Sequence, residues 1–245
     1  MDWFDNVVFW ELFYDWMFSP QVFEEAKEQV DDIVKLTGIN SGKVLDLCCG
    51  PGRHSIPFNK KGFEVTGVDL HQFLLDKAKS YSIKENLEIE LVQADMRKFV
   101  RTDSYDLVIN MYSSFGYFQN PDEDFHVLDN VYHSLKKDGK IIIDVRGKEI
   151  HAMQNIEIQS HDLPNGDLII DRGKVRDGWT SVDSDWMYIK DGVLRSFQLN
   201  FNLYSGAELR RLMSKAGFQN VRLYGDLKGI PYNQKAKRLI AVGEK

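Results

Sequence analysis

The sequence predicts an α/β protein with a doubly wound, seven-stranded sheet, an inserted antiparallel β-meander and an N-terminal helical cap. Two observations support this prediction. From Gly42 onward, short β-branched runs alternate with helical segments, which is typical of a mainly parallel sheet. Between residues 156 and 203, three Asn-Gly or Asp-Gly dipeptides separate runs of strand character, which is typical of successive hairpins.

Composition limits the class of protein. The chain has 245 residues, of which 43% are hydrophobic and 28% charged, enough for one large globular domain. Its formal charge of −6 argues against a nucleic-acid partner, because phosphate binding needs a dense field of cations. The adjacent pair Cys48 and Cys49 and an acidic N-terminus indicate a reduced, cytoplasmic protein. No apolar run reaches the ~20 residues of a membrane helix, so no membrane partner is expected.

The first 38 residues are expected to form a helical cap over a ligand pocket. Residues 3–18 are rich in aromatic side chains interrupted by acidic ones, and Ser19-Pro20 then marks the start of a helix over residues 22–36. A helix lying on a membrane would prefer Lys and Arg on its polar face, so we favour the cap.

The α/β core is expected in two pieces, residues 39–150 and 204–245. Ser205 and Glu208 have the spacing of a capping box, which marks a helix start in the second piece. The predicted strands are 43–47, 63–68, 87–92, 105–110, 140–145, 219–224 and 238–243, and the predicted helices are 53–61, 71–81, 122–137 and 205–216.

Residues 151–203 are expected to be a four-stranded lid. The turn dipeptides are Asn165-Gly166, Asp177-Gly178 and Asp191-Gly192, and the intervening runs carry aromatic residues that would cover an apolar pocket. We see no linker or internal repeat, so the chain is expected to be a single domain with this elaboration.

The most informative stretch is VLDLCCGPGRHS, a hydrophobic strand followed by a glycine turn and a helix. Gly50 and Gly52 allow the backbone to approach a ligand and to present amide donors at the helix start. Asp46 ends the strand, where a carboxylate meets a ligand ammonium group directly or through water. A turn of this kind alone is a weak signal, since many nucleotide-binding proteins have one.

Acidic residues also end the next two predicted strands. Asp69, in GVDL, suits a bidentate contact to ribose hydroxyls. Asp95, in QADM, suits an adenine amino group, with Met96 against the ring. Because the carboxyl ends of parallel strands lie at one edge of a sheet, these acids should face one ligand.

These motifs resemble those of the class I S-adenosylmethionine-dependent methyltransferases, over about residues 40–145 and 205–243. The resemblance implies a Rossmann-like sheet of order 3-2-1-4-5-7-6 with strand 7 antiparallel, S-adenosylmethionine as cofactor, S-adenosylhomocysteine as product, and no metal. Cys48 stands where the family commonly has glycine. The resemblance assigns cofactor contacts to Asp46, Cys48, Gly50, Gly52, Asp69, Leu70, Asp95, Met96 and Asn110.

The meander and aromatic N-terminus are similar to those of family members that methylate small metabolites, including amino-sugar N-methyltransferases. That likeness implies a small-molecule acceptor, methylated at N or O, and places Tyr14 at the methionine end of the cofactor. Such an enzyme is expected to be a monomer or homodimer. In-line methyl transfer requires mainly alignment, so few catalytic residues are expected. The candidates are Tyr112, Tyr117 and His126 for catalysis, and Ser113 and Arg146 for acceptor binding.

Three other functions fit parts of the pattern. A nicotinamide-dependent oxidoreductase shares the sheet, but Ser55 stands where its G-x-G-x-x-G fingerprint needs the third glycine. A methyltransferase acting on RNA or protein is a second alternative, and the net charge argues against RNA. A binding protein that keeps the cofactor fold without catalysis is the third.

Overall fold

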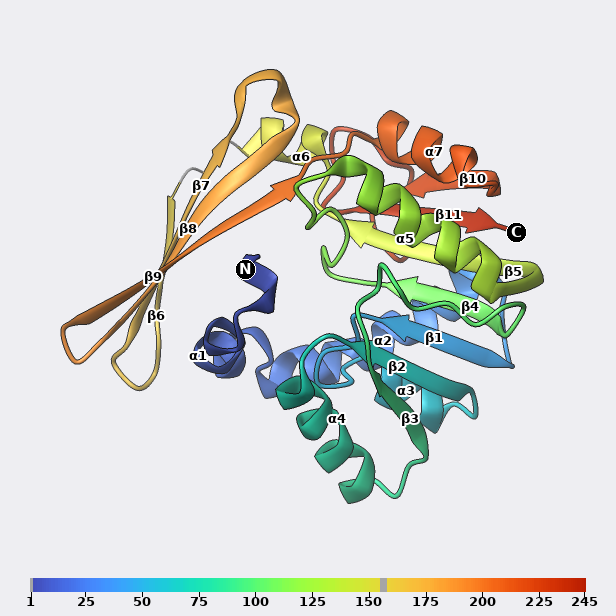
Figure 1. Ribbon diagram of the computed structural model, residues 1–245, viewed down its shortest axis with the longest axis horizontal. Helices are drawn as coiled ribbons and strands as arrows, with labels where there is room; N and C mark the ends of the chain where they lie inside the picture. Colours follow the sequence, from blue (N-terminus) through green and yellow to red (C-terminus); the bar gives the residue numbers. More distant parts are fainter. Residues whose placement is uncertain (1, 155–157) are drawn as a thin grey trace.

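The computed structural model describes residues 2–154 and 158–245, and seven of its strands form one mixed sheet. The strands are β1 (Lys43–Leu47), β2 (Glu64–Asp69), β3 (Ile89–Gln93), β4 (Tyr105–Asn110), β5 (Leu135–Val145), β10 (Gln219–Tyr224) and β11 (Leu239–Glu244). Their order is β10-β11-β5-β4-β1-β2-β3, and β11 runs antiparallel to both β5 and β10 (Figure 1). The predicted order and the antiparallel last strand are confirmed.

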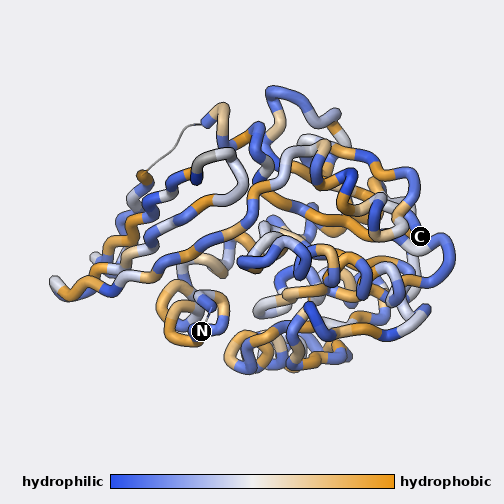
Figure 2. The backbone as a smooth tube through the Cα atoms, turned by 45° about the horizontal axis from the view of Figure 1, so that its top comes forward, coloured by the Kyte–Doolittle hydropathy of each residue, from blue (hydrophilic) through white to orange (hydrophobic). Residues whose placement is uncertain are grey.

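Helices cover both faces of this sheet, which is why its central strands read as continuous hydrophobic runs. The helices are α2 (Pro20–Thr37), α3 (Ser55–Lys60), α4 (Gln72–Lys84), α5 (Pro121–Ser134) and α7 (Gly206–Lys215). Apolar side chains of α2 and α3 pack on one face, and those of α5 and α7 pack on the other. Figure 2 shows the central strands as the most hydrophobic part of the core.

Several predicted helix boundaries were wrong by two or three residues, and two of these differences have a clear cause. The helix expected at 122–137 ends at Ser134, because Leu135 is fully buried and already pairs with Tyr105 of β4. The helix expected from residue 53 begins at Ser55, because Gly52 has a left-handed φ of 81° and the turn continues through the next two residues. The capping box of α7 is present as predicted.

A second sheet contains four antiparallel strands in the order β6-β7-β8-β9. Gly166, Gly178 and Gly192 have left-handed φ values of 86°, 79° and 74°, which explains the three predicted turns. Residues 148–154 form a short helix, α6, so the meander begins later than predicted, and residues 155–157 lie outside the described part. The strands are β6 (Ile158–Asp162), β7 (Leu168–Val175), β8 (Ser181–Lys190) and β9 (Val193–Asn202).

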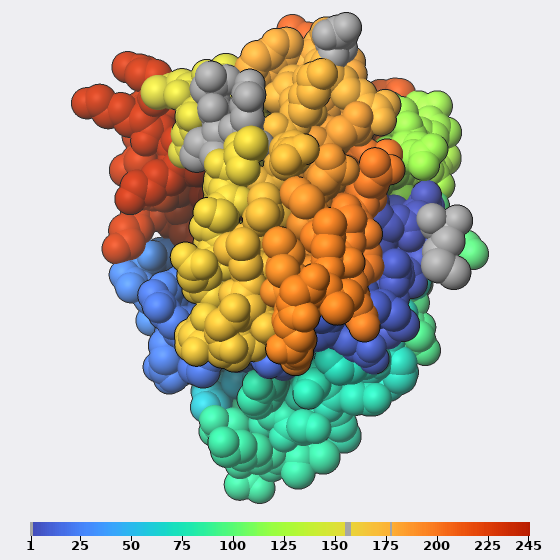
Figure 3. All heavy atoms as spheres, turned by 90° about the vertical axis from the view of Figure 1, so that its left-hand side faces the viewer, coloured from blue at the N-terminus to red at the C-terminus, as the bar shows by residue number. Residues whose placement is uncertain are grey.

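The N-terminal segment lies between the two sheets (Figure 1). A short 3-10 turn (Trp3–Asp5) leads into α1 (Val7–Met17). Phe9 and Phe13 of α1 are buried against Ile169, Tyr188 and Leu199 of the meander. Figure 3 shows the broad outer face of the meander with the N-terminal segment along one side. The predicted cap therefore joins the meander to the core.

Candidate active site

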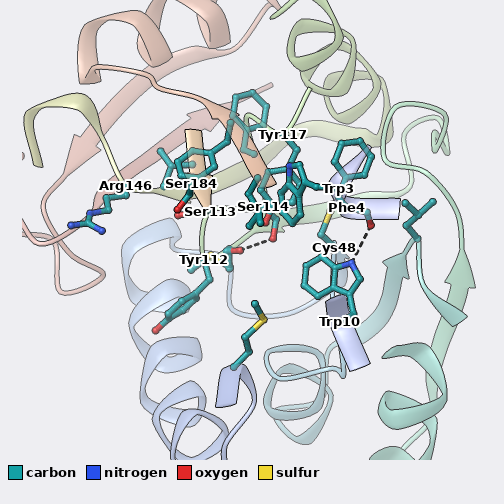
Figure 4. A pocket seen from close by; sticks show the side chains of 18 of the residues that line it. Trp3, Phe4, Trp10, Cys48, Tyr112, Ser113, Ser114, Tyr117, Arg146 and Ser184 are labelled. Carbon is teal, nitrogen blue, oxygen red and sulfur yellow. Dashed lines mark hydrogen bonds between the residues drawn. The ribbon is translucent and has the colours of Figure 1, made fainter. Parts of the chain in front are cut away.

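A cavity of about 660 Å³ lies beyond the carboxyl ends of β1, β2 and β4. Its floor is the turn after β1, and its roof is formed by the N-terminal segment and the inner face of the meander. Figure 4 shows Trp3, Phe4 and Trp10 on one side of this space and Arg146 on the opposite side. This is the edge at which ligands of doubly wound sheets bind.

The turn after β1 contains three residues with left-handed backbone conformations. Cys48, Gly50 and Gly52 have φ values of 64°, 55° and 81°. A side chain at Cys48 therefore occupies a position that favours glycine. Its Sγ atom lies 3.4 Å from the Sδ atom of Met96, and both residues line the cavity.

The three predicted acidic residues line the same cavity. Asp46 is buried and accepts a hydrogen bond of 2.6 Å from the Ser55 hydroxyl, and burial raises its pKa to about 6. Asp69 accepts the backbone N–H groups of Gly50 at 2.8 Å and His71 at 3.0 Å. Burial still raises the pKa of Asp69 above its usual range, although these hydrogen bonds oppose the effect.

Asp95 differs from the other two because it is held in an ion pair. Its Oδ2 atom lies 2.6 Å from an Nη atom of Arg97, which also contacts Glu123 at 2.8 Å. Burial favours the neutral acid, but the hydrogen bonds from Arg97 outweigh it and hold the pKa of Asp95 below its usual range. This carboxylate is therefore charged and fixed in orientation. Leu70 and Met96 provide apolar surface beside it.

Arg53 and Tyr112 form a stacked pair at the cavity wall. The Arg53 guanidinium carbon lies 3.4 Å from the Tyr112 ring centre. Arg53 is only 7% exposed, and one of its Nη atoms has no hydrogen-bond partner among the described residues. Gln29 of α2 donates to the Tyr112 hydroxyl and contacts His54 Nε2 at 3.0 Å. A buried guanidinium with an unused donor is a site for an anionic group.

Tyr112 and Ser113 both have left-handed backbones, with φ values of 57° and 66°. Asp144 of β5 holds this turn, because its carbonyl accepts the Ser113 N–H at 2.8 Å. Arg238 pairs with the Asp144 carboxylate at 2.6 Å and donates to the Ser113 hydroxyl at 3.0 Å. The sequence did not identify Arg238, because its partners are 94 and 125 residues away.

Several predicted residues do line the cavity. Tyr117 packs against the rings of Trp3, at 4.7 Å, and Phe4, at 6.0 Å. Burial raises the pKa of the Tyr117 hydroxyl well above its usual range. Tyr112, Ser113 and Arg146 line the wall toward the meander.

Four predicted site residues do not line the cavity. His126 is exposed on α5 and does not line the cavity, because the helix turns Val127 and Leu128 toward the sheet. Tyr14 is buried between Phe18 of the cap and Phe73 of α4. The other two, Asn110 and Gly52, lie beneath the floor of the cavity.

Asn110 is 2% exposed and donates to the Leu47 carbonyl at 3.1 Å, which ties β4 to the turn. Gly52 packs against α4, where a Cβ atom would lie 3.2 Å from the Ala78 Cβ. Both residues shape the floor without reaching the cavity surface.

The sequence predicted an aromatic cap over the pocket, but it did not identify which side chains of the cap line the cavity or which polar groups lie opposite them. Trp3, Phe4 and Trp10 line the cavity, as do His71, His151 and Ser184. The aromatic density of residues 3–18 was the only signal for the roof. Within residues 2–154 and 158–245, no three His, Cys, Asp or Glu side chains cluster as a metal site would need, and no helix is long and apolar enough to cross a membrane.

The arrangement of the strands and the turn agrees with comparisons to known proteins. A family described as methyltransferase domain matches residues 44–139. A protein of Geobacillus sp. (strain WCH70) is 28% identical over 162 residues, which are 65% of this chain and 64% of that protein. A glycine/sarcosine N-methyltransferase of Aphanothece halophytica is 28% identical over 200 residues, 75% of this chain and 69% of that protein. Residues 44–139 therefore resemble a methyltransferase domain, and the chain is similar to methyltransferases over most of its length.

The methyltransferase match spans about two thirds of the length of these two curated relatives, at 64% and 69%. A solved S-adenosylmethionine-dependent methyltransferase from Clostridium acetobutylicum has a TM-score of 0.79 at 15% identity, over 96% of this chain and 97% of that one. An S-adenosylmethionine-bound amino pentose methyltransferase from Micromonospora echinaspora has a TM-score of 0.65 at 18% identity, over 91% of each chain. These structural matches establish the fold of the methyltransferase, and its acceptor must be argued from the site.

Proposed function

We propose that this methyltransferase moves the methyl group of S-adenosylmethionine onto an amine nitrogen of a small molecule. The observation that carries the proposal is the cavity itself, which brings Asp46, Asp69 and Asp95 together with the buried Arg53 under a roof of aromatic side chains. The names of two relatives, a glycine/sarcosine N-methyltransferase and an amino pentose methyltransferase, favour nitrogen and a small acceptor.

The residues of the cavity fit S-adenosylmethionine group by group. Asp46 is the buried acid near the carboxyl end of β1 and would bind the ammonium group. The unused Nη donor of Arg53 would bind the carboxylate of the same methionine moiety. Asp69 has acceptor capacity beyond its two backbone bonds and would bind the ribose hydroxyls. Asp95 and Met96 would meet the adenine.

Bound S-adenosylmethionine would supply a methyl group on a positively charged sulfur. The lone pair of the acceptor nitrogen would form the new C–N bond as the C–S bond breaks, and sulfur would keep the electron pair of that bond. The proton released by the nitrogen would pass to solvent. The chain's own contribution is alignment and exclusion of water. Trp3, Phe4 and Trp10 close the cavity on one side. Because the pKa of Tyr117 is raised by burial, its hydroxyl stays protonated and orients the amine as a hydrogen-bond partner.

Calorimetry with S-adenosylmethionine and S-adenosylhomocysteine tests the cofactor, with NADH and NADPH as controls. We expect micromolar binding of the first pair alone. Transfer of labelled methyl groups to matched amines and alcohols then tests the acceptor atom, and we expect label only in the amines. Binding of NADH instead, or label in the alcohols, would contradict the proposal.

A further inference from the structure

The two ends of the cavity carry opposite charge. Three carboxylates, Asp46, Asp69 and Asp95, line the end formed by the first three strands. The other end is lined by Arg146, Arg238 and His151. Figure 4 shows Arg146 on the side opposite the aromatic roof and Cys48. Because cofactor recognition uses the acidic end, the basic end is free to recognise the acceptor.

Arg146 is the cation of the basic end that has no ion-pair partner among the residues that the structure describes. Arg238 is paired with Asp144 at 2.6 Å. Asp171 also lines this end, where it accepts a hydrogen bond from Ser184. Arg146 donates to Gln154 of α6, and within the described ranges no carboxylate lies within 4.0 Å of it, although the negative charge of Asp171 acts on it from farther away. Arg146 is therefore available to an anionic group of a ligand.

His151 adds an unused hydrogen-bonding atom beside these cations. Its Nε2 atom is buried and has no partner in the described part of the chain. Burial, together with the charges of Arg146 and Arg238, lowers the pKa of His151 to about 4. The ring is therefore neutral at physiological pH and supplies one N–H and one lone pair. A buried polar atom without a partner is costly unless a ligand satisfies it.

We propose that the acceptor amine also carries a carboxylate, and that Arg146 binds this carboxylate with His151 as a hydrogen-bond partner. One guanidinium without an ion-pair partner matches one carboxylate group of a ligand. The planar guanidinium also matches a carboxylate in two parallel hydrogen bonds. This inference rests on the proposed amine methylation and narrows its substrates to small amino acids.

The test pairs each amino acid with its neutral amide. Sarcosine and β-alanine are compared with sarcosinamide and β-alaninamide in the wild type, in Arg146→Met and in a control, Arg210→Met, which changes an exposed arginine of α7. We expect the wild type to prefer the acids by at least about tenfold in kcat/KM. Arg146→Met should lower kcat/KM for the acids on the order of a hundredfold, mainly through KM, and leave the amides within about twofold.

A binding measurement covers the case in which no member of the panel is turned over. The ring resonances of His151, assigned with His151→Gln, are followed by NMR in the S-adenosylhomocysteine complex as acetate or β-alanine is added. We expect either carboxylate to raise the pKa of His151 in the wild type and not in Arg146→Met. Equal use of acids and amides, or no response of His151 to any carboxylate, would overturn the inference. Absence of S-adenosylhomocysteine binding would instead contradict the proposed function.

Discussion

The Tyr112 ring is stacked against the guanidinium group of Arg53, whose carbon lies 3.4 Å from the ring centre, and the guanidinium carbon of Arg238 lies 5.5 Å from the same ring centre. Arg53 comes from the turn after β1, and Arg238 from the residue just before β11. The pair therefore connects the cofactor end of the cavity to its basic end through one aromatic side chain. Asp144, the ion-pair partner of Arg238, also accepts the Tyr112 N–H at 3.3 Å. This hydrogen bond helps to hold the left-handed backbone of Tyr112.

The first prediction concerns Arg53. Arg53→Met keeps the apolar stem over Tyr112 and removes the guanidinium. We expect S-adenosylhomocysteine affinity to fall by about 10- to 100-fold, since hydrogen bonds to a charged group contribute about 1.5–3 kcal/mol. Calorimetry measures this directly. 5′-Methylthioadenosine lacks the carboxylate and should bind the wild type and the variant equally, whereas a similar loss for both ligands would contradict the assignment.

The second prediction concerns Asp69. Asp69→Ala removes the acceptor for the Gly50 and His71 amides and the expected ribose contact. We expect cofactor affinity to weaken by about 1–3 kcal/mol, the scale for leaving buried hydrogen-bonding partners unmatched. Comparing adenosine with 2′,3′-dideoxyadenosine separates the two effects. The ribose contact predicts a loss for adenosine that is reduced for the dideoxy ligand, and unchanged affinity in the variant would rule it out.

The third prediction is a pH dependence that originates at Asp46. Burial raises its pKa to about 6, whereas an unfolded aspartate titrates at about 3.9. The folded chain therefore binds more protons between these values, and raising the pH through this window favours the unfolded chain. We expect Asp46→Asn to increase the free energy of unfolding at about pH 7, on the order of 2–3 kcal/mol, with little difference at about pH 4.

Guanidinium chloride unfolding of both proteins at the two pH values measures this difference. The same variant should bind S-adenosylhomocysteine more weakly at about pH 7, because it lacks the charge opposite the ammonium group. A variant that is both less stable and equally tight in binding would show that Asp46 stabilises the fold and does not serve the cofactor.

The core fold was predictable from local patterns. Strand-helix alternation identified all seven strands of the main sheet, and the turn dipeptides identified the meander, because both signals depend on residues close in sequence. The boundary of α5 was not predictable, since Leu135 joins the sheet through pairing with Tyr105, thirty residues earlier. Tertiary pairing overrides helical propensity there.

The clustering of three acids in the cavity was also predictable, because Asp46, Asp69 and Asp95 lie at or near the ends of strands and parallel strands bring their ends together. The basic end was not. Arg238 reaches Ser113 across 125 residues, and no local pattern distinguishes it from a surface arginine. Helical spacing did carry information about His126, because Val127 and Leu128 are the buried residues of that turn.

The fourth prediction is that ligand binding orders the roof. Trp3 links three parts of the molecule, because its Nε1–H donates to the Asn200 carbonyl of β9 at 3.0 Å and its ring lies 4.7 Å from Tyr117. The His71 ring contacts the carbonyl of Phe4, which directly follows Trp3. The cofactor end of the cavity is therefore tied to the same N-terminal segment. A cofactor enclosed by the roof can enter only when these contacts of Trp3 and Phe4 break. Once bound, it should stabilise the conformation in which the contacts are formed.

Hydrogen exchange with and without S-adenosylhomocysteine measures that stabilisation. We expect slower exchange in residues 3–18 and in the meander as well as in the turn after β1. Trp3→Ala should lose the protection of residues 3–18 and weaken S-adenosylhomocysteine binding by about tenfold, whereas Trp179→Ala, which changes a 43% exposed residue at the margin of the cavity, should retain both. Protection confined to the turn after β1 would mean that the roof is already closed in the free protein, and that the cofactor reaches the cavity by another path.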